Sequence, residues 1–422
     1  MTIYYINLLI IFALAWPLCI YKPSKAKTIL YLLITFGFMW FLAAFRYDIG
    51  YDYHTYLARF EAMAGENGYQ AGREFGFEPG FVLVSVALSK IVSGPVGVYG
   101  AYTLLIFLPV MWFIFRHSKS PRLSTWMYVT LTFFYGTMNF IRQNMAASVL
   151  LMGYSLLVKN RCLKLPLPKS IPIGKLFGQG EENYFPIPLF WAVVLAASTF
   201  HKTALIMIPI SLACQIKLDK VMGAVYAGVT LLLFMTSGPI LDIVTNHIYT
   251  YYKGTYYITR GFTDLIFLMI PVMLLGACLA LWPAWQKRDP AAKVHMNLIL
   301  YNCIIWIFIT RHFILERFSL FVYIFALVGV PSALGSLRCT DEEYEYLAMT
   351  KKEDAASKKK ARSKEEQGKL RLLGQKIKDH EKYYWSAVVA LLLMTLIYNE
   401  FGGQVNGFHG VFPYQSLLSW LP

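Results

Sequence analysis

The run "IYYINLLIIFALAWPLCIY", Ile3 to Tyr21, decides the fold class of this chain. It contains no Asp, Glu, Lys or Arg and is about 20 residues long, which is enough for a helix to cross the hydrocarbon core of a bilayer. No basic segment precedes it and no small-residue cleavage site follows it. We therefore expect a retained transmembrane helix and not a signal peptide.

Similar apolar runs recur along the rest of the chain. Of its 422 residues, 57% are hydrophobic, and the mean hydropathy is +0.48. This is more apolar sequence than a soluble core requires. Because a backbone surrounded by lipid must satisfy its own hydrogen bonds, the repeated runs predict an all-α polytopic membrane protein.

Basic loops between the apolar runs orient the predicted helices. These loops are "YKPSKAK" (21–27), "RHSKSPR" (116–122), "KNRCLKLPLPK" (159–169), "KLDK" (217–220) and "WQKRDPAAK" (285–293). Lys and Arg are enriched in cytoplasmic loops, so we place all five there. Both termini then lie outside, and the chain has about 12 transmembrane helices. The predicted spans are residues 2–20, 28–45, 97–115, 122–139, 143–158, 186–200, 203–216, 221–244, 262–284, 294–311, 317–336 and 383–399.

Two segments stand apart from this pattern. The run "PGFVLVSVALSKIV" (79–92) is short, and a crossing there would invert every later loop, so we predict a re-entrant or interfacial external helix. The charged tract 338–382 is expected to be a cytoplasmic insertion, either a helical hairpin or a partly disordered linker. The predicted organisation is a core over 1–337 with an external loop at 46–78, this insertion, and a last helix with an external segment over 383–422.

The net charge of +15 follows from the basic loops and needs no nucleic acid partner. All six cysteines fall in predicted helices or on the predicted cytoplasmic side, so we expect no disulfide. No Cys/His spacing resembles a zinc site. We expect neither a metal ion nor a cofactor.

Charged residues gather on the predicted external side, beginning with "FRYDIGYDYHTYLARFE" (45–61). Charge at a membrane boundary is costly and usually marks a pathway or a site. A single arginine there can simply pair with a local acid or a lipid phosphate, but several from separate stretches favour a binding site. The candidates for a diphosphate, which guanidinium groups bind through two parallel hydrogen bonds, are Arg46, Arg142, His201, Lys202, Arg311 and Arg317.

Tyrosines and carboxylates on the same side add two further kinds of chemistry. Aromatic faces pack against sugar rings while polar groups bind the hydroxyls, although tyrosines also populate membrane interfaces without binding anything. The candidate sugar-binding residues are Tyr51, Tyr53, Tyr56, Gln143, Arg260 and Tyr414. The candidate general bases are Asp48, Asp52 and Glu78.

Asp52 is the first choice of base. It follows Gly50, where the backbone turns freely, and is flanked by tyrosines that can seat a sugar. Asp48 lies two residues from Arg46, whose charge would lower the pKa of Asp48 and make it a poor proton acceptor. Glu78, just before Pro79, is the second choice. A purely structural or sugar-binding role for Asp52 stays open.

Several motifs resemble the EpsG-like branch of Wzy-type polysaccharide polymerases. They are "RYDIGYDYHTY" (46–56), "EPGF" (78–81), "NFIRQNMAASVLL" (139–151) and "STFHKTALIMIP" (198–209), with weaker similarity at Arg317 and "VFPYQSLL" (411–418). The resemblance implies a bacterial inner-membrane protein that is similar in outline to C-type glycosyltransferases. It also implies that undecaprenyl-diphosphate-linked oligosaccharide units are polymerised at the periplasmic face. A chain-length regulator and a flippase are the partners it suggests.

Three alternatives compete with this interpretation. A polysaccharide flippase would line a cavity at mid-membrane depth with its charges instead of placing them on one face. A membrane O-acyltransferase would need a catalytic His on the cytoplasmic side, whereas His201 and His312 are predicted outside. An O-antigen ligase, or another external glycosyltransferase, uses the same donor and differs only in the family motifs.

Overall fold

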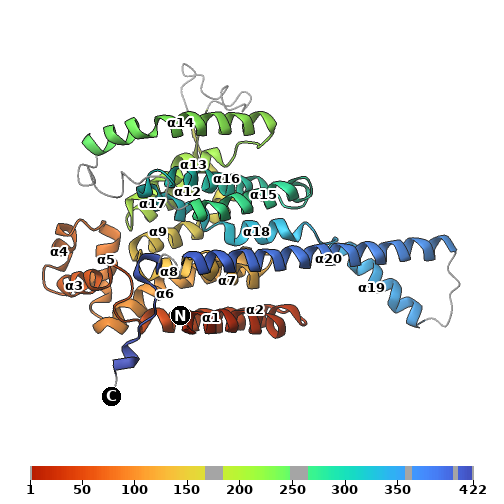
Figure 1. Ribbon diagram of the computed structural model, residues 1–422, viewed down its shortest axis with the longest axis horizontal. Helices are drawn as coiled ribbons and strands as arrows, with labels where there is room; N and C mark the ends of the chain where they lie inside the picture. Colours follow the sequence, from red (N-terminus) through yellow and green to blue (C-terminus); the bar gives the residue numbers. More distant parts are fainter. Residues whose placement is uncertain (1, 167–183, 248–264, 357–363, 403–406, 421–422) are drawn as a thin grey trace.

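The computed structural model describes residues 2–166, 184–247, 265–356, 364–402 and 407–420, and these ranges are almost entirely helical. Most of the long helices run side by side along the long axis of the molecule (Figure 1). The principal long helices are α1 (Thr2–Ala15), α2 (Lys25–Ala44), α6 (Gly94–His117), α14 (Lys220–His247), α15 (Leu265–Arg288), α16 (Ala292–Ile309), α19 (Asp341–Ala356) and α20 (Lys364–Glu400).

Six helices among the described residues are long and apolar enough to cross a membrane. They cover Thr2–Ile20, Lys25–Ala44, Gly94–His117, Lys220–Pro239, Phe267–Arg288 and Ala292–Ile309. A bent pair, Phe313–Tyr323 and Ala326–Gly335, would make a seventh span with a 54° bend. Large apolar side chains such as Leu9, Leu232 and Met269 face outward, as expected where lipid is the solvent. The chain is therefore an all-α polytopic membrane protein, and the count of about 12 helices stays a prediction.

The middle of the chain is more broken than the sequence suggests. Predicted spans 122–139 and 143–158 each divide into a pair of shorter helices, and the region after them also consists of short pieces. These pieces are α7 (Pro121–Thr130), α8 (Phe133–Thr137), α9 (Ile141–Met152), α10 (Tyr154–Val158), α12 (Phe190–Ser198), η2 (Lys202–Ile206) and α13 (Met207–Ala213). The first break falls at Thr132, whose φ is +68°. Irregular backbone at membrane depth is tolerated where it is buried in protein or lines a cavity.

A short antiparallel pair of strands is a departure from helix that the residue patterns did not suggest. Strand β1 (Cys162–Pro166) pairs with β2 (Tyr184–Pro188), with Cys162 opposite Pro188. Both strands flank residues 167–183, which lie outside the described part of the chain. Strand β1 falls in the predicted basic loop 159–169, whereas β2 takes the first residues of the predicted span 186–200, so the helix there begins later than predicted, with α12 at Phe190.

Three short helices gather at one end of the molecule, on the left in Figure 1. They are α3 (Tyr53–Met63), α4 (Gly68–Glu74) and α5 (Pro79–Leu88). Helix α5 is ten residues long, or about 15 Å, which is half the thickness of a hydrocarbon core. The C-terminal turns η6 (Gly407–Gly410) and η7 (Leu417–Trp420) lie at this same end.

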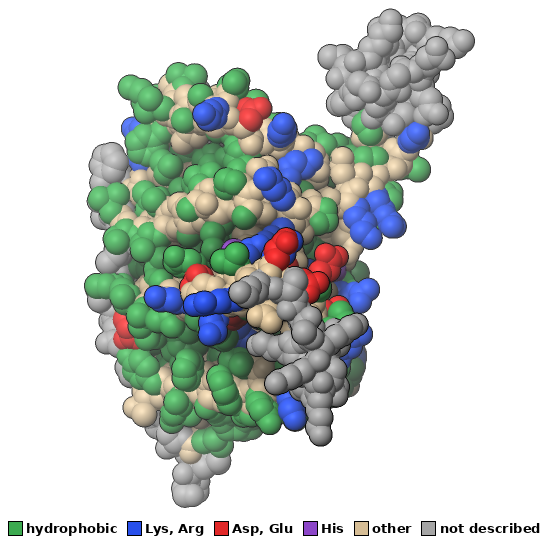
Figure 2. Space-filling model, turned by 90° about the vertical axis from the view of Figure 1, so that its right-hand side faces the viewer, with side chains coloured by type: hydrophobic (Ala, Val, Ile, Leu, Met, Phe, Trp, Pro, Cys, Tyr) green, Lys and Arg blue, Asp and Glu red, His purple; other side chains and the backbone are tan. Residues whose placement is uncertain are grey.

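Helices α19 and α20 project from the opposite end (Figure 1). Helix α20 runs without interruption through residues 382 and 383, where the sequence suggested a boundary between insertion and membrane helix. The tract is rich in Lys and Glu and also contains Ala and Leu, which are all strong helix formers, so the apolar helix continues into it. Lys and Arg side chains are spread over this end of the molecule (Figure 2).

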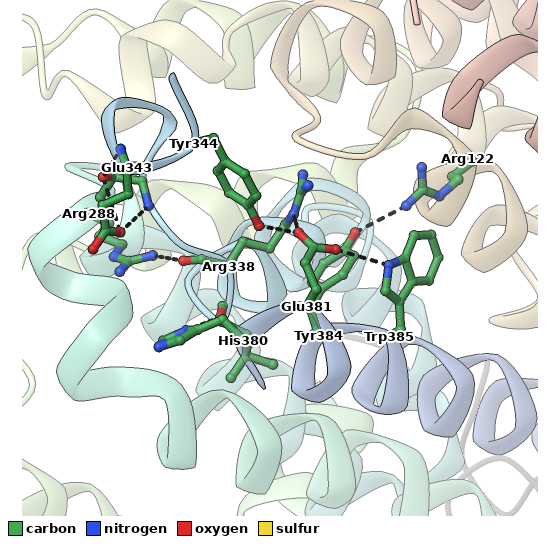
Figure 3. A network of polar contacts seen from close by, with 11 residues as sticks. Arg122, Arg288, Arg338, Glu343, Tyr344, His380, Glu381, Tyr384 and Trp385 are labelled. Atoms are coloured by element: carbon green, nitrogen blue, oxygen red, sulfur yellow. Dashed lines mark hydrogen bonds and ion pairs between the residues drawn. The ribbon is translucent and has the colours of Figure 1, made fainter. Parts of the chain in front are cut away.

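Glu381 joins this projecting pair of helices to the bundle (Figure 3). Its carboxylate accepts hydrogen bonds from Arg338 at 2.8 Å, from Trp385 at 3.1 Å and from the hydroxyl of Tyr344. Nearby, Arg122 on α7 donates to Tyr384 at 3.2 Å. The base of the projection is thus fixed by charge-assisted contacts, which are stronger than neutral hydrogen bonds.

Candidate active site

A cavity of about 560 Å³ opens between the broken helices and the end that carries α3 to α5. It is bounded by the loop before α3, by α8 and α9, by η4 (Phe313–Leu315) and α17 (Glu316–Tyr323), and by η6. Its polar and aromatic lining includes Tyr51, Asp52, Tyr56, Thr132, Asn139, Phe140, Arg142, Gln143, Asn144, His201, Trp306, Phe313, Glu316, Arg317, Ser319, Tyr323, Tyr398, Phe408 and His409. Seven of the residues predicted from the sequence are in this lining: Tyr51, Asp52, Tyr56, Arg142, Gln143, His201 and Arg317.

Asp52 reaches the cavity through a tight turn. Gly50 has a φ of +86°, and a Cβ at that position would lie 2.7 Å from the carbonyl oxygen of Met138, so only glycine fits. The backbone N–H of Asp52 donates to Oδ1 of Asn139 at 3.3 Å. Asp52 is also the N-cap residue of α3, yet its carboxylate makes no capping hydrogen bond. The carboxylate therefore remains available to a ligand.

Burial raises the pKa of Asp52 above its ordinary value. The positive charges of Arg142, Arg59 and Arg317 act in the opposite direction and offset part of this rise, as does His409 when it is protonated. A carboxylate with a raised pKa accepts a proton more readily than a solvated one, which is the property that a general base needs.

Glu78 and Arg142 form a salt bridge that ties three motifs together. Nη1 of Arg142, in the first turn of α9, donates to Oε2 of Glu78 at 2.6 Å. The other carboxylate oxygen of Glu78 accepts the backbone N–H of Lys202 at 3.2 Å. The guanidinium of Arg142 also lies over the ring of Phe77, 4.5 Å from its centroid. Glu78 does not itself line the cavity; it holds Arg142 at the edge of it.

His201 lies beside these groups and is uncharged at neutral pH. Burial, together with the nearby charges of Arg142, Arg317 and Lys202, lowers the pKa of His201 to about 3. Its Nδ1 is in hydrogen-bond contact with the hydroxyl of Thr203. His201 can therefore offer a ligand a hydrogen bond but no positive charge.

Arg46, Tyr53 and Tyr414 support the loop before α3 from behind instead of lining the cavity. The guanidinium carbon of Arg46 lies 3.9 Å from the ring centroid of Tyr99, and Tyr53 stacks on that same ring at 4.7 Å. The hydroxyl of Tyr414 donates to the carbonyl of Leu42 at 3.0 Å. These three predicted ligands are packing residues in the structure.

The other predicted residues also lie away from the cavity lining. Arg311 donates to the carbonyl of Phe234 on α14 at 2.7 Å. Asp48 is exposed and pairs with His54 at 2.9 Å. Lys202 contributes its backbone N–H to Glu78, and its side chain does not line the cavity. Arg260 lies outside the described residues.

Several cavity residues were not among the predicted ligands. Asn139, Phe140 and Asn144 lie within the motif "NFIRQNMAASVLL", so their position in the sequence was a usable signal. Glu316 and His409 were recognisable only as external ionisable residues. Their Oε1 and Nε2 atoms lie 3.4 Å apart, although the residues are almost a hundred positions apart in the chain.

Comparisons with known proteins bear on the same residues. No curated protein and no solved structure matches the chain. The similarity in outline to C-type glycosyltransferases therefore stays an expectation. The family model described as "EpsG family" matches residues 29–167 and 185–343. These ranges cover most of the chain and include Asp52, Glu78, Arg142 and Arg317, while His409 lies beyond them. The chain belongs to the EpsG family, whose members are associated with polysaccharide polymerisation.

Proposed function

We propose that this protein polymerises lipid-linked oligosaccharide repeat units whose donor is carried on undecaprenyl diphosphate. The observation that carries the proposal is the lining of one cavity by two arginines, a carboxylate with a raised pKa and several aromatic rings. The reaction involves a diphosphate anion, an acceptor hydroxyl and sugar rings. The arginines suit the anion, the carboxylate suits the hydroxyl, and the aromatic rings suit the sugars.

Arg142 and Arg317 would bind the donor diphosphate. Arg142 uses Nη1 for Glu78, and its buried Nε has no hydrogen-bond partner within the described residues. Guanidinium groups stabilise the charge that develops on a departing diphosphate, because they are aimed at it before the reaction begins. Neutral His201 would add a hydrogen bond, and Tyr51, Tyr56 and Gln143 would contact the sugars.

Asp52 would act as the general base. The acceptor hydroxyl oxygen attacks the anomeric carbon of the donor sugar, and its proton passes to the Asp52 carboxylate. The bond between the anomeric carbon and the phosphate oxygen breaks, and its electron pair leaves with the diphosphate. Glu78 is less suited to this role, because both of its oxygens already bind the protein. We assign it to positioning Arg142.

The cavity would face the periplasm of a bacterial inner membrane. Support comes from the basic residues at the end of the molecule opposite α3 to α5 (Figure 2), since Lys and Arg favour the cytoplasmic side. A flippase and a chain-length regulator would act with it, because repeat units must reach the outer leaflet and polymer length must be set.

The test uses purified protein and undecaprenyl-diphosphate-linked repeat units. Asp52→Asn keeps the size of the side chain but cannot take the proton, so we expect polymerisation to fall about 10²–10⁴-fold while donor binding is unchanged. Glu78→Gln should instead weaken donor binding, because Arg142 loses its partner. Near wild-type polymerisation by Asp52→Asn, with an inactive Glu78→Gln that still binds donor, would assign the base to Glu78.

A further inference from the structure

The C-terminal segment, residues 407–418, lies against the loop that carries Asp52. Four backbone hydrogen bonds join them: Gly50 N–H to Gly410 O (3.0 Å), Tyr51 N–H to His409 O (3.1 Å), Tyr47 N–H to Gln415 O (3.0 Å) and Leu417 N–H to Phe45 O (2.9 Å). A segment near the end of the chain is therefore part of the wall next to the proposed base.

Aromatic side chains fix this segment in place. The hydroxyl of Tyr4 donates to the carbonyl of Val411 at 2.9 Å, and Val411 is fully buried. The ring of Phe412 packs against Tyr4 and Tyr135, with centroids 4.7 and 4.8 Å away. These contacts hold the backbone directly after η6 in one position.

His409 is held in an unfavourable backbone conformation at the cavity. Its φ is +56°, and that of the preceding Phe408 is +30°, both in the left-handed region that favours glycine. Two successive residues with side chains in this region cost free energy, and such strain concentrates at functional sites. Six non-glycine residues in the described chain have positive φ, and three of them line the cavity: Thr132, Phe408 and His409.

The His409 ring is surrounded by groups suited to a sugar. Phe140, Phe313 and Tyr51 lie around it, with ring centroids at 4.6, 6.2 and 6.3 Å. Oε1 of Glu316 lies 3.4 Å from its Nε2. Both side chains are only partly buried, with 18% and 22% of their surface exposed, so a ligand in the cavity can reach them.

We propose that His409 contacts the acceptor sugar and that Glu316 positions its ring. With Nε2–H directed to Glu316, the neutral ring keeps Nδ1 as an acceptor for a sugar hydroxyl. A diphosphate is disfavoured here because two carboxyl side chains, Glu316 and Asp52, lie on this side of the cavity. This inference rests on the proposed function, and it assigns the side of the cavity near His409 and Glu316 to the acceptor sugar.

The experiment separates acceptor binding from donor binding. The donor is the undecaprenyl-diphosphate-linked repeat unit, and the acceptor probe is the same repeat unit on a plain alkyl group, which can accept but cannot donate. We compare His409→Ala, His409→Asn and Glu316→Gln with the matched control His54→Ala. His54 is also an external histidine paired with a carboxylate, at 2.9 Å, but it does not line the cavity.

We expect His409→Ala to raise KM for the alkyl-linked acceptor about tenfold, the effect of one lost hydrogen bond, with little change in donor binding. His409→Asn should recover part of the loss, because its amide oxygen lies near the position of Nδ1. Glu316→Gln should give a smaller rise, and His54→Ala none.

An unchanged acceptor KM in His409→Ala would overturn the inference, as would an equal loss of donor binding in that variant. A wild-type protein that extends no repeat units would overturn the proposed function itself. The two failures can be told apart, because the acceptor KM of His409→Ala is measured only after the wild-type protein has been shown to polymerise.

Discussion

Glu78 and Asp52 are two carboxylates near the same arginine, and their different surroundings are the reason for the different roles that we propose for them. Glu78 accepts hydrogen bonds at both oxygens, from Arg142 and from the backbone of Lys202. Asp52 lines the cavity, its carboxylate makes no capping hydrogen bond, and its pKa is raised. At the scale of single residues, a carboxylate engaged by the protein positions its partner, and one facing a cavity is free to react.

The pKa of Asp52 gives a prediction for pH dependence. Arg59 lowers this pKa, so Arg59→Gln should raise it further. A base works only when deprotonated, and activity is lost as the pH falls through its pKa. The acidic limb of the kcat/KM profile should therefore move to higher pH in Arg59→Gln. Lys90→Gln, which removes an exposed charge from the same end, should leave the profile in place. Coincident profiles for Arg59→Gln and wild type would remove Asp52 as the titrating base.

The guanidinium group of Arg142, which can donate two parallel hydrogen bonds, gives a second prediction at this scale. A lysine can keep one contact to Glu78 but cannot offer parallel hydrogen bonds to a diphosphate. We expect Arg142→Lys to lose about 10- to 100-fold in kcat/KM for the donor, nearly as much as Arg142→Ala. Polymer length on a gel, at matched protein level, is the second measurement. Full-length polymer from the lysine variant would indicate that only the charge matters.

At the scale of elements, helix α20 joins two regions that differ in composition. Its apolar part packs in the bundle, and its charged part projects with α19 from the end opposite the cavity (Figure 1). The contacts of Glu381 and Arg338 at the base of this projection hold it to the bundle. The outer part makes no contribution to the cavity lining.

We therefore expect the tip of this projection to be dispensable for the reaction. Replacing residues 352–367 by a short flexible linker keeps the pair formed by Glu343 and Lys376, whose atoms are 2.6 Å apart. Turnover of lipid-linked repeat units should stay within about twofold of wild type, because the site is remote. Glu381→Ala, which breaks the base of the projection, is the informative comparison and should lower thermal stability. Loss of turnover in a well-folded tip deletion would assign the tip a functional role.

At the scale of the whole molecule, the two ends differ in the elements that they carry. One end holds α3 to α5, the cavity and the C-terminal segment, and the other carries α19 and a spread of basic residues (Figures 1 and 2). We propose from the positive-inside rule that the cavity faces outward, and this orientation stays a prediction.

This orientation predicts how introduced cysteines react in intact cells. In a variant whose accessible native cysteines are replaced, Gly65→Cys should be modified by an impermeant thiol reagent and Lys119→Cys should be protected. Gly65 lies between α3 and α4, and Lys119 lies between α6 and α7. Permeabilised cells, in which both positions should react, provide the control. Equal labelling in intact cells would contradict the orientation and the periplasmic site.

The sequence by itself determined the class of the protein and many of the residues that line the cavity. Apolar runs of spanning length predict membrane helices. A backbone in lipid must form its hydrogen bonds within its own helix, so each run can be recognised without knowing the rest of the fold. Asp52 and Arg142 were recognisable because each lies in a short motif where composition is unusual for a membrane protein. Family membership follows from the same motifs.

The tertiary structure alone decided which of these residues meet. Glu78, Arg142 and Lys202 converge because α5, α9 and η2 pack together, and no local pattern records that packing. Arg46 and Arg311 looked equivalent to Arg142 in sequence, yet one stacks on Tyr99 and the other binds the backbone of α14. His409 and Glu316 meet only through long-range pairing of the chain end with the first loop. Contacts between distant segments depend on the packing of the whole chain, so they are settled only when the bundle forms.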